Sequence, residues 1–170
     1  MNPLYLGDSY DLVKRFFCRE LSLLGYSVSV DAMLTGDWNS SERDFYRLIG
    51  AAPLNDEVPI SNRAALFLDP DTGINARGGK QHASFERIAK ECASYELVFA
   101  FDQSFSRQAK AKDVMRKKLS ALRGEGCHGM YYDSHARFVF VANERSVLDE
   151  LQIWLVSLGL PESRLLTADA

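Results

Sequence analysis

The chain has 170 residues, of which 46% are hydrophobic and 25% charged, and its formal net charge is −3. This is an ordinary globular composition, and the length is that of one domain, which can bury a core without disulfides or a structural metal. We therefore expect a single domain over residues 1–170. An acidic chain is unlike a protein that binds nucleic acid over its whole surface, so any such binding would need a local basic patch.

Cysteine usage and hydropathy indicate the compartment. The three cysteines, Cys18, Cys92 and Cys127, form no CxxC pair and lie in or beside apolar stretches, as small core residues do. No apolar run approaches the roughly 18 residues needed to span a bilayer, and no signal-peptide pattern precedes the first element. We expect a cytoplasmic protein without a membrane partner.

The first half of the chain predicts two helices and two strands. Apolar residues recur at helical spacing between residues 8 and 24, with Asp8 or Ser9 as the N-cap and Gly25 as the stop. Residues 26–31 alternate and are β-branched, which predicts a strand that ends at Asp31. A short helix is expected over 42–49 and a loop over 51–62. The apolar run 64–69 predicts a buried strand that ends at Asp69.

The second half continues the alternation. We expect a loop over 71–81, a helix over 84–94, a second fully apolar strand over 96–102, and a long helix over 106–123. Two short strands, 130–132 and 137–141, and a helix over 145–158 complete the chain. Alternating strands and helices predict a three-layer, Rossmann-like α/β fold with a mostly parallel sheet. The short link between the last two strands makes this closing pair antiparallel.

Three of the predicted strands end on an aspartate, namely Asp31, Asp69 and Asp102, and Asp71 follows shortly after Asp69. Ligands of open α/β sheets bind outside the carboxyl ends of the strands, so we expect these carboxylates along one edge. Hard cations such as Mg²⁺ take carboxylate oxygens. The pattern therefore predicts a metal site of Asp69, Asp71 and Asp31, with Asp102 as a further ligand. The alternative is structural, because aspartate is also a favoured turn and N-cap residue.

Other polar residues near these strand ends are candidates for binding or catalysis. Thr72-Gly73 forms the turn after Asp71, where glycine permits a conformation that other residues resist. Ser104 or Ser106 either caps the following helix or binds a phosphate at its N-terminus together with Arg107. His135, between the two closing strands, is either a general base or a surface turn residue.

The predicted helix that follows Arg107 is strongly basic. It carries Arg107, Lys110, Lys112, Arg116, Lys117, Lys118 and Arg123 against one acid, Asp113. Such a helix is able to contact a phosphate backbone, which makes nucleic acid a candidate partner of residues 107–123. The alternative is an ordinary solvated helix face.

The segment Leu66-Phe67-Leu68-Asp69-Pro70-Asp71 resembles part of the class I methyltransferase fold. In adenine-N6 methyltransferases, an Asp-Pro-Pro-Tyr-like motif ends the fourth strand. The later order of helix, strand, helix and antiparallel closing pair is similar too, and residues 26–31 would correspond to the family's first strand. The resemblance implies S-adenosylmethionine as cofactor. Ala32-Met33-Leu34-Thr35-Gly36-Asp37 stands where the family has its glycine-rich cofactor loop, and Asp71-Thr72 where it has Pro-Tyr.

These observations leave three functions open. The first is a Mg²⁺-dependent phosphodiesterase or nuclease acting on a nucleotide or nucleic acid, with Asp69, Asp71, Asp102, Arg107 and His135 as catalytic residues. In this hypothesis Asp31, Thr72, Gly73 and Ser104 would contribute to cofactor binding. The second is a methyltransferase-like enzyme that uses S-adenosylmethionine. The third is a non-catalytic nucleotide-sensing or interaction module.

Overall fold

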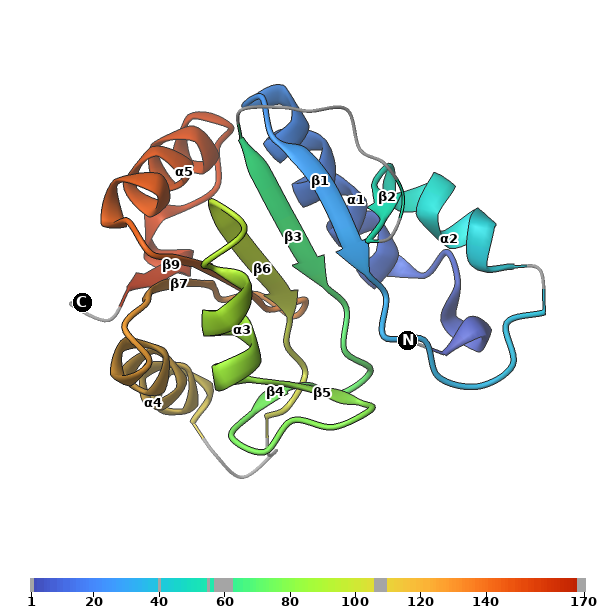
Figure 1. Cartoon of the computed structure of the whole chain (residues 1–170). Helices are drawn as coiled ribbons and strands as arrows, with labels where there is room; N and C mark the ends of the chain where they lie inside the picture. Colours follow the sequence, from blue (N-terminus) through green and yellow to red (C-terminus); the bar gives the residue numbers. More distant parts are fainter. Residues whose placement is uncertain (1, 40, 55, 57–62, 106–109, 168–170) are drawn as a thin grey trace.

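In the part of the chain that the structure describes, the main sheet has seven strands in the order β2-β1-β3-β6-β8-β7-β9 (Figure 1). The computed structural model describes residues 2–39, 41–54, 56, 63–105 and 110–167. The strands are β1 (Ser27–Asp31), β2 (Ala52–Pro53), β3 (Ala64–Leu68), β6 (Leu97–Phe101), β7 (His128–Tyr132), β8 (Phe138–Ala142) and β9 (Leu165–Thr167). A separate parallel pair consists of β4 (Gly73–Asn75) and β5 (His82–Ser84).

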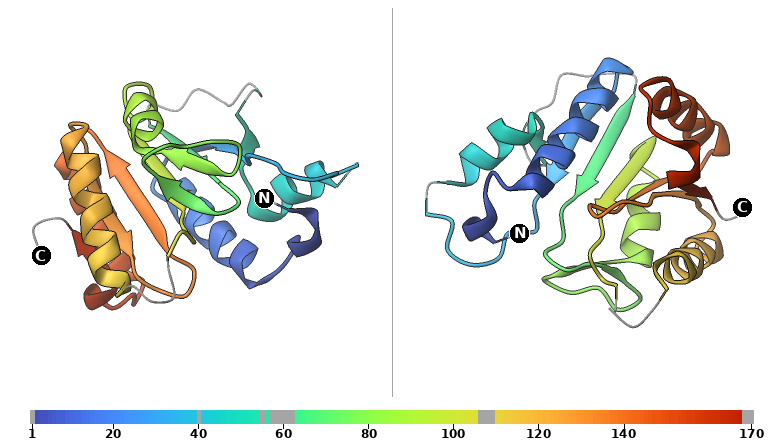
Figure 2. Two further views of the ribbon diagram at one scale, coloured as in Figure 1. Left: turned by 90° about the horizontal axis from the view of Figure 1, so that it is seen from below. Right: turned by 180° about the vertical axis from the view of Figure 1, so that it is seen from behind.

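Helices cover both faces of the sheet, which gives the predicted three-layer α/β architecture (Figures 1 and 2). The helices are α1 (Ser9–Leu23), α2 (Glu42–Ile49), α3 (Phe85–Glu91), α4 (Ala111–Gly124) and α5 (Arg145–Ser157). Helices α1, α2 and α5 pack on one face of the sheet, and helices α3 and α4 pack on the other. No helix in the described part of the chain is long and apolar enough to cross a membrane.

The two faces hold two separate cores because successive strand side chains point to opposite sides. On the α1 face, Phe67 and Phe99 stack with ring centroids 4.8 Å apart, and Phe17 of α1 packs on Phe138 at 4.7 Å. On the opposite face the strands contribute smaller aliphatic residues such as Leu66, which pack beneath α3 and α4. The fully apolar strands therefore serve two cores at once.

The predicted sheet arrangement is confirmed. The strands β3 and β6 are adjacent and parallel, with Leu66 opposite Val98, and both strands are almost entirely buried. The strands β7 and β8 form the antiparallel closing pair. Five of the seven strands run in one direction, while β8 and β9 run in the other, so the sheet is mostly parallel.

Short strands account for most of the differences from the predicted elements. The loops expected over 51–62 and 71–81 contain β2 and β4, and β5 and β9 were not predicted. Segments of two or three residues carry almost no periodicity, so only their pairing partners reveal them. The helix expected over 106–123 is described from Ala111 to Gly124, and residues 106–109 lie outside the described part of the chain.

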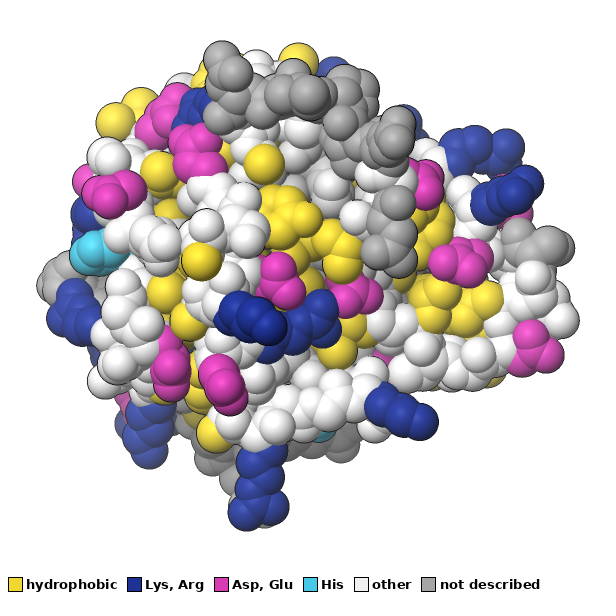
Figure 3. Space-filling model, viewed as in Figure 1, with side chains coloured by type: hydrophobic (Ala, Val, Ile, Leu, Met, Phe, Trp, Pro, Cys, Tyr) yellow, Lys and Arg dark blue, Asp and Glu magenta, His cyan; other side chains and the backbone are white. Residues whose placement is uncertain are grey.

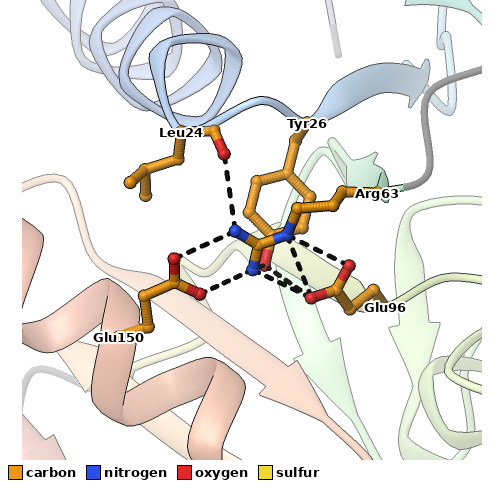
Figure 4. Close-up of polar contacts among 5 residues, drawn as sticks. All are labelled: Leu24, Tyr26, Arg63, Glu96 and Glu150. Atoms are coloured by element: carbon orange, nitrogen blue, oxygen red, sulfur yellow. Dashed lines mark hydrogen bonds and ion pairs between the residues drawn. The ribbon is translucent and has the colours of Figure 1, made fainter.

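An arginine cluster fastens the amino ends of the central strands to α5 (Figure 4). The Arg63 guanidinium lies before β3 and binds Glu96, which lies before β6, at 2.8 Å and Glu150 of α5 at 2.7 Å. It also stacks on the Tyr26 ring at 4.1 Å and donates to the Leu24 carbonyl at 3.4 Å. Hydrogen bonds from Arg63 lower the pKa of Glu150. One planar cation thus joins four separate segments.

We expect Arg63→Lys to destabilise the protein by about 1.5–3 kcal/mol, since an ammonium cannot form two forked ion pairs and stack on a ring. Urea unfolding measures the change. The matched control is Arg47→Lys, because Arg47 pairs with Asp44 on the exposed surface of α2 and should change stability by less than about 0.5 kcal/mol. If both substitutions changed the free energy of unfolding equally, Arg63 would not stabilise the protein by joining these segments.

Candidate active site at the carboxyl edge of the sheet

The three strand-ending aspartates follow neighbouring strands, as predicted, but they do not point the same way. The register pairs Asp31 with Leu68 and Leu68 with Ala100, so these three side chains share one face. Asp102, two residues beyond Ala100, lies on that same face. Asp69, one residue beyond Leu68, lies on the other. The pleat of the sheet therefore separates Asp69 from Asp31 and Asp102.

Each of these aspartates has its own basic partner from the layer it faces. Asp69 accepts a hydrogen bond from Lys14 of α1, and Asp102 from Lys118 of α4. Asp31 pairs with Arg87 of α3 and also accepts the backbone N–H of Met33. The three carboxylates are thus neutralised separately.

A cavity of about 240 Å³ opens at the carboxyl ends of β3 and β6, beside the start of α1. Among the described residues, four aspartates and one lysine contribute to its lining, so acidic side chains outnumber basic ones. The lining residues are Asn2, Tyr5, Asp8, Tyr10, Asp11, Lys14, Asp69, Pro70, Asp71, Phe101 and Gln103.

Lys14 is a buried residue in the lining of this cavity. Its ammonium lies 2.9 Å from an Asp11 oxygen and 2.8 Å from an Asp69 oxygen, and all three side chains are almost fully buried. Rings of Phe45 and Phe101 lie 5.5 and 5.1 Å from the same nitrogen. Burial lowers the pKa of Lys14, but the two carboxylates outweigh it and raise that pKa above its ordinary value. The raised pKa favours the charged ammonium of Lys14 at neutral pH.

Burial acts on Asp69 in the opposite sense. It raises the pKa of this carboxyl, and the attraction of Lys14 offsets that effect only in part. Asp11 is held by a second bond, since its other oxygen accepts the Gly7 backbone N–H at 2.8 Å. The buried Asp11–Lys14–Asp69 group is thus arranged before any ligand arrives.

The walls of the cavity are aromatic. The rings of Tyr10 and Phe101 lie 5.3 Å apart, and Tyr10 also stacks on His135 at 5.6 Å. The Tyr10 hydroxyl and His135 Nε2 are hydrogen-bonded at 2.8 Å, so the histidine expected as a candidate base contacts the cavity through Tyr10. At the rim, Asp71 accepts the Thr35 hydroxyl at 3.2 Å.

Asp102 and Ser104 form a different, internal cluster. Asp102 accepts hydrogen bonds from Lys118 at 2.6 Å, Tyr131 at 2.7 Å, and the Ile74 backbone N–H at 3.1 Å. Ser104 donates to the Ile74 carbonyl at 2.7 Å and also contacts Lys118. Burial lowers the pKa of Lys118, and Asp102 partly offsets that shift. This cluster holds β4 against the end of β6 and does not line the cavity.

Thr72 and Gly73 belong to the same supporting structure. The Thr72 hydroxyl donates to the Gln81 carbonyl at 2.9 Å and contacts the His82 ring. Gly73 has a φ of +99°, as the predicted turn requires, and a Cβ there would lie only 2.1 Å from Asp102 Oδ1. Glycine is therefore needed at position 73 for two reasons: the turn requires a positive φ, and the chain lies too close to Asp102 for a Cβ.

The predicted metal ligands are not gathered into a ready-made metal site. Within residues 2–39, 41–54, 56, 63–105 and 110–167, no group of three His, Cys, Asp or Glu side chains could hold a metal ion. Asp69 and Asp71 both line the cavity, whereas Asp31 lies on the opposite face of the sheet. Ser106 and Arg107, expected to bind phosphate, lie outside the described residues.

Most of the described cations on the basic helix are exposed, but one of them is buried. Lys118 faces inward to Asp102, so it belongs to the internal cluster and not to the outer face. The exposed cations on or next to α4 are Lys110, Lys112, Arg116, Lys117 and Arg123.

The sequence reasoning missed Tyr10, Lys14 and Phe101, three residues that build the cavity. A signal for Lys14 was present. It lies three residues after Asp11 and three before the buried Phe17, so helical spacing places the lysine on the buried face of α1. A buried lysine needs a carboxylate partner, and Asp11 was within reach on the same helix.

Comparison with protein-family models, with curated proteins and with solved structures finds no match. The fold and the site therefore define the class to which the chain belongs. It is a Rossmann-like α/β protein with an acidic, aromatic-walled cavity at the carboxyl edge of its sheet.

Proposed function

We propose that this cavity binds the ring of a nucleoside-type ligand. The observation that carries the proposal is the combination of aromatic walls, Tyr10 and Phe101, with the carboxylates of Asp69 and Asp71 in one cavity. Aromatic side chains stack on nucleobases, and carboxylates accept hydrogen bonds from base amino groups. Tyr10 and Asp71 are the partly exposed members of these two pairs, while Phe101 and Asp69 lie buried beside them.

The size and charge of the cavity narrow the ligand. A volume of about 240 Å³ is below the roughly 300–1,000 Å³ of pockets that enclose a drug-sized ligand, so one ring fits and the rest of the molecule lies outside. The four aspartates against Lys14 repel a phosphate and favour hydrogen-bond donors or a positive charge. The ring is therefore the part that enters.

A Mg²⁺-dependent phosphodiesterase is the rival proposal. It would require Asp69 to exchange Lys14 for a metal ion, although Lys14 already satisfies that buried carboxylate. The geometry thus favours ligand binding that does not depend on a metal. Nucleotide binding that persists in EDTA supports our proposal, and binding or hydrolysis that requires Mg²⁺ supports the rival.

The residues placed to move a proton at the cavity are Tyr10 and His135. Their side chains are hydrogen-bonded at 2.8 Å, and an imidazole paired with a hydroxyl is an arrangement that general acid–base chemistry uses. His135 is exposed to solvent. A reaction at this site would use the pair as its proton shuttle.

A methyltransferase-like activity is the second candidate. Asp69-Pro70-Asp71 follows the central strand β3 and lines the cavity, and Asp71 is its partly exposed residue. S-adenosylmethionine carries an adenine ring and a sulfonium cation, and both suit an acidic cavity with aromatic walls. S-adenosylmethionine therefore belongs among the ligands to be tested.

A thermal-shift series tests these proposals, because a ligand that binds only the folded state raises the melting temperature. The ligands are the four common ribonucleosides, their monophosphates, S-adenosylmethionine and Mg²⁺. We expect a shift with at least one base-containing ligand in EDTA. A response to Mg²⁺ alone, or to none of these ligands, would overturn the proposed function.

We predict that Asp71→Asn weakens binding of the responding ligand at least tenfold, since the amide cannot supply two acceptor oxygens. Its stability should change by less than about 0.5 kcal/mol, because Asp71 is only half-buried and asparagine can still accept from Thr35. Calorimetric titration measures the affinity. Asp113→Asn removes the same charge from exposed α4 and should leave the affinity unchanged; equal losses in both variants would point to a general charge effect.

Nucleic acid binding by the exposed cations of α4 stays a prediction. The support for it is the exposure of Lys112, Arg116, Lys117 and Arg123 on this helix, next to the exposed Lys110. This surface is separate from the cavity and is independent of the ligand proposed above.

A further inference from the structure

A second hollow lies across the sheet edge from the cavity, on the α3 side. This groove has a volume of about 760 Å³, within the range of pockets that hold a whole ligand. It is formed by the segment after β1 and the segment that enters β5. Its lining residues are Asp31, Met33, Leu34, Thr35, Gly36, Gly79, Lys80, Gln81, His82 and Arg87.

The groove is basic where the cavity is acidic. Among the described residues, its lining has two basic side chains, Lys80 and Arg87, and one acidic side chain, Asp31. Arg87 pairs with Asp31 and also lies 3.9 Å from Glu91 of its own helix. Lys80 is exposed, and the part of the lining that the structure describes holds no second acid to match its charge. Figure 3 shows dark blue side chains over α3 and over the region of β4 and β5, with acidic side chains close by.

His82 adds a polar group on the same side. The Thr72 hydroxyl donates to the Gln81 carbonyl and also contacts Nδ1 of the His82 ring at 2.7 Å. The other ring nitrogen, Nε2, also lies near this hydroxyl, at 3.1 Å. Lys80 and His82 therefore give the groove a cation and an imidazole within one short segment.

The groove and the cavity meet at one hydrogen bond. Thr35 lines the groove, Asp71 lines the cavity, and the Thr35 hydroxyl donates to the Asp71 carboxylate at 3.2 Å. A ligand that lies across the carboxyl ends of β1 and β3 would touch both hollows. This is the crevice in which open α/β sheets bind their ligands.

Building on the proposed function, we propose that the groove is the anion subsite of the same ligand, so that the ligand is a nucleotide and not a free nucleoside. Its ring enters the acidic cavity, and its phosphate lies over Lys80 in the groove. The separation of charge sets this direction, because a phosphate is repelled by the cavity aspartates and attracted by the groove cation.

Calorimetric titration of the four ribonucleosides and their 5′-monophosphates, in EDTA, tests the proposal. We expect at least one monophosphate to bind ten times more tightly than its nucleoside. Lys80→Glu should weaken the binding of that monophosphate at least tenfold and change the affinity for the nucleoside less than twofold. The matched control is Arg77→Glu, which makes the same charge change at an exposed residue of the same loop that does not line the groove.

The fluorescence of Trp38 gives a second measurement of ligand binding that is independent of calorimetry. Its indole donates to the Thr35 carbonyl at 3.1 Å, so its fluorescence should respond when a ligand contacts the Thr35 segment. The chain has two tryptophans, and Trp154→Phe leaves Trp38 as the only one. The monophosphate should change this signal with the affinity measured by calorimetry.

The possible outcomes separate the two proposals. Equal affinities for nucleoside and monophosphate, or equal losses in Lys80→Glu and Arg77→Glu, would overturn the anion subsite while leaving the ring-binding cavity in place. If no nucleoside or monophosphate binds, both proposals are overturned. Binding of inorganic phosphate as tightly as the monophosphate would show that the groove acts without the cavity, which also contradicts a single ligand.

Discussion

Replacing Lys14 by methionine should destabilise the protein by about 3–5 kcal/mol, the usual cost of breaking a buried ion pair by removing one partner. The substitution leaves the carboxylates of Asp11 and Asp69 buried beside each other without a cation. Methionine fills much the same space, so lost packing contributes little. Urea unfolding at neutral pH measures the difference from the wild-type protein.

A double-mutant cycle identifies the electrostatic cause. Asp69→Asn alone should cost about 1.5–3 kcal/mol, as expected for a lost hydrogen bond to a charged group. In the Lys14→Met background the same change should cost much less, or even stabilise, because it removes an unpaired buried charge. A Mg²⁺ site at Asp69 predicts instead that Asp69→Asn keeps or raises the stability of the metal-free protein. Additive losses in the cycle would contradict the ion-pair role.

The pH dependence gives an independent check. The pKa of Lys14 is raised in the folded protein above its ordinary value of 10.5. Its contribution to stability is therefore fully present below about pH 10 and is lost as the pH rises through the folded-state pKa. The free-energy gap between wild-type protein and Lys14→Met should narrow above that pH. A gap that stays constant would show that the charge of Lys14 is not its source.

Gly73→Ala should be nearly as damaging, at about 3–5 kcal/mol. The added methyl would lie 2.1 Å from Asp102 Oδ1 and 2.7 Å from the Gln103 nitrogen, so one of these segments must move. Moving Asp102 disturbs its bonds to Lys118 and Tyr131. Backbone strain at a φ of +99° and steric crowding each cost about 1–3 kcal/mol.

Gly79→Ala is the matched control for this prediction. Gly79 also has a positive φ, +139°, but a Cβ there meets nothing within 4 Å. We expect it to cost only the backbone strain, about 1–3 kcal/mol, so the two losses differ by the clash with Asp102. Urea unfolding of both variants measures that difference. Similar losses in both would show that Asp102 yields without cost.

The sequence by itself determined the architecture. The two fully apolar strands, β3 and β6, allowed only a central, parallel, doubly covered position, and the structure confirms it. The helix boundaries followed from caps, as at Asp8 and Gly25, where local chemistry acts within a few residues. Strands of two or three residues escaped prediction because their stability comes from distant pairing partners.

The site depended on information that local patterns do not contain. That Asp31, Asp69 and Asp102 end neighbouring strands was readable from the sequence, but the direction of each side chain follows from the register, which the fold decides. A shift of one residue along the pleat sends Asp69 to Lys14 and leaves Asp102 with Lys118. The contact of Tyr10 with His135 joins residues 125 positions apart. Only tertiary packing decided which charges meet at the cavity.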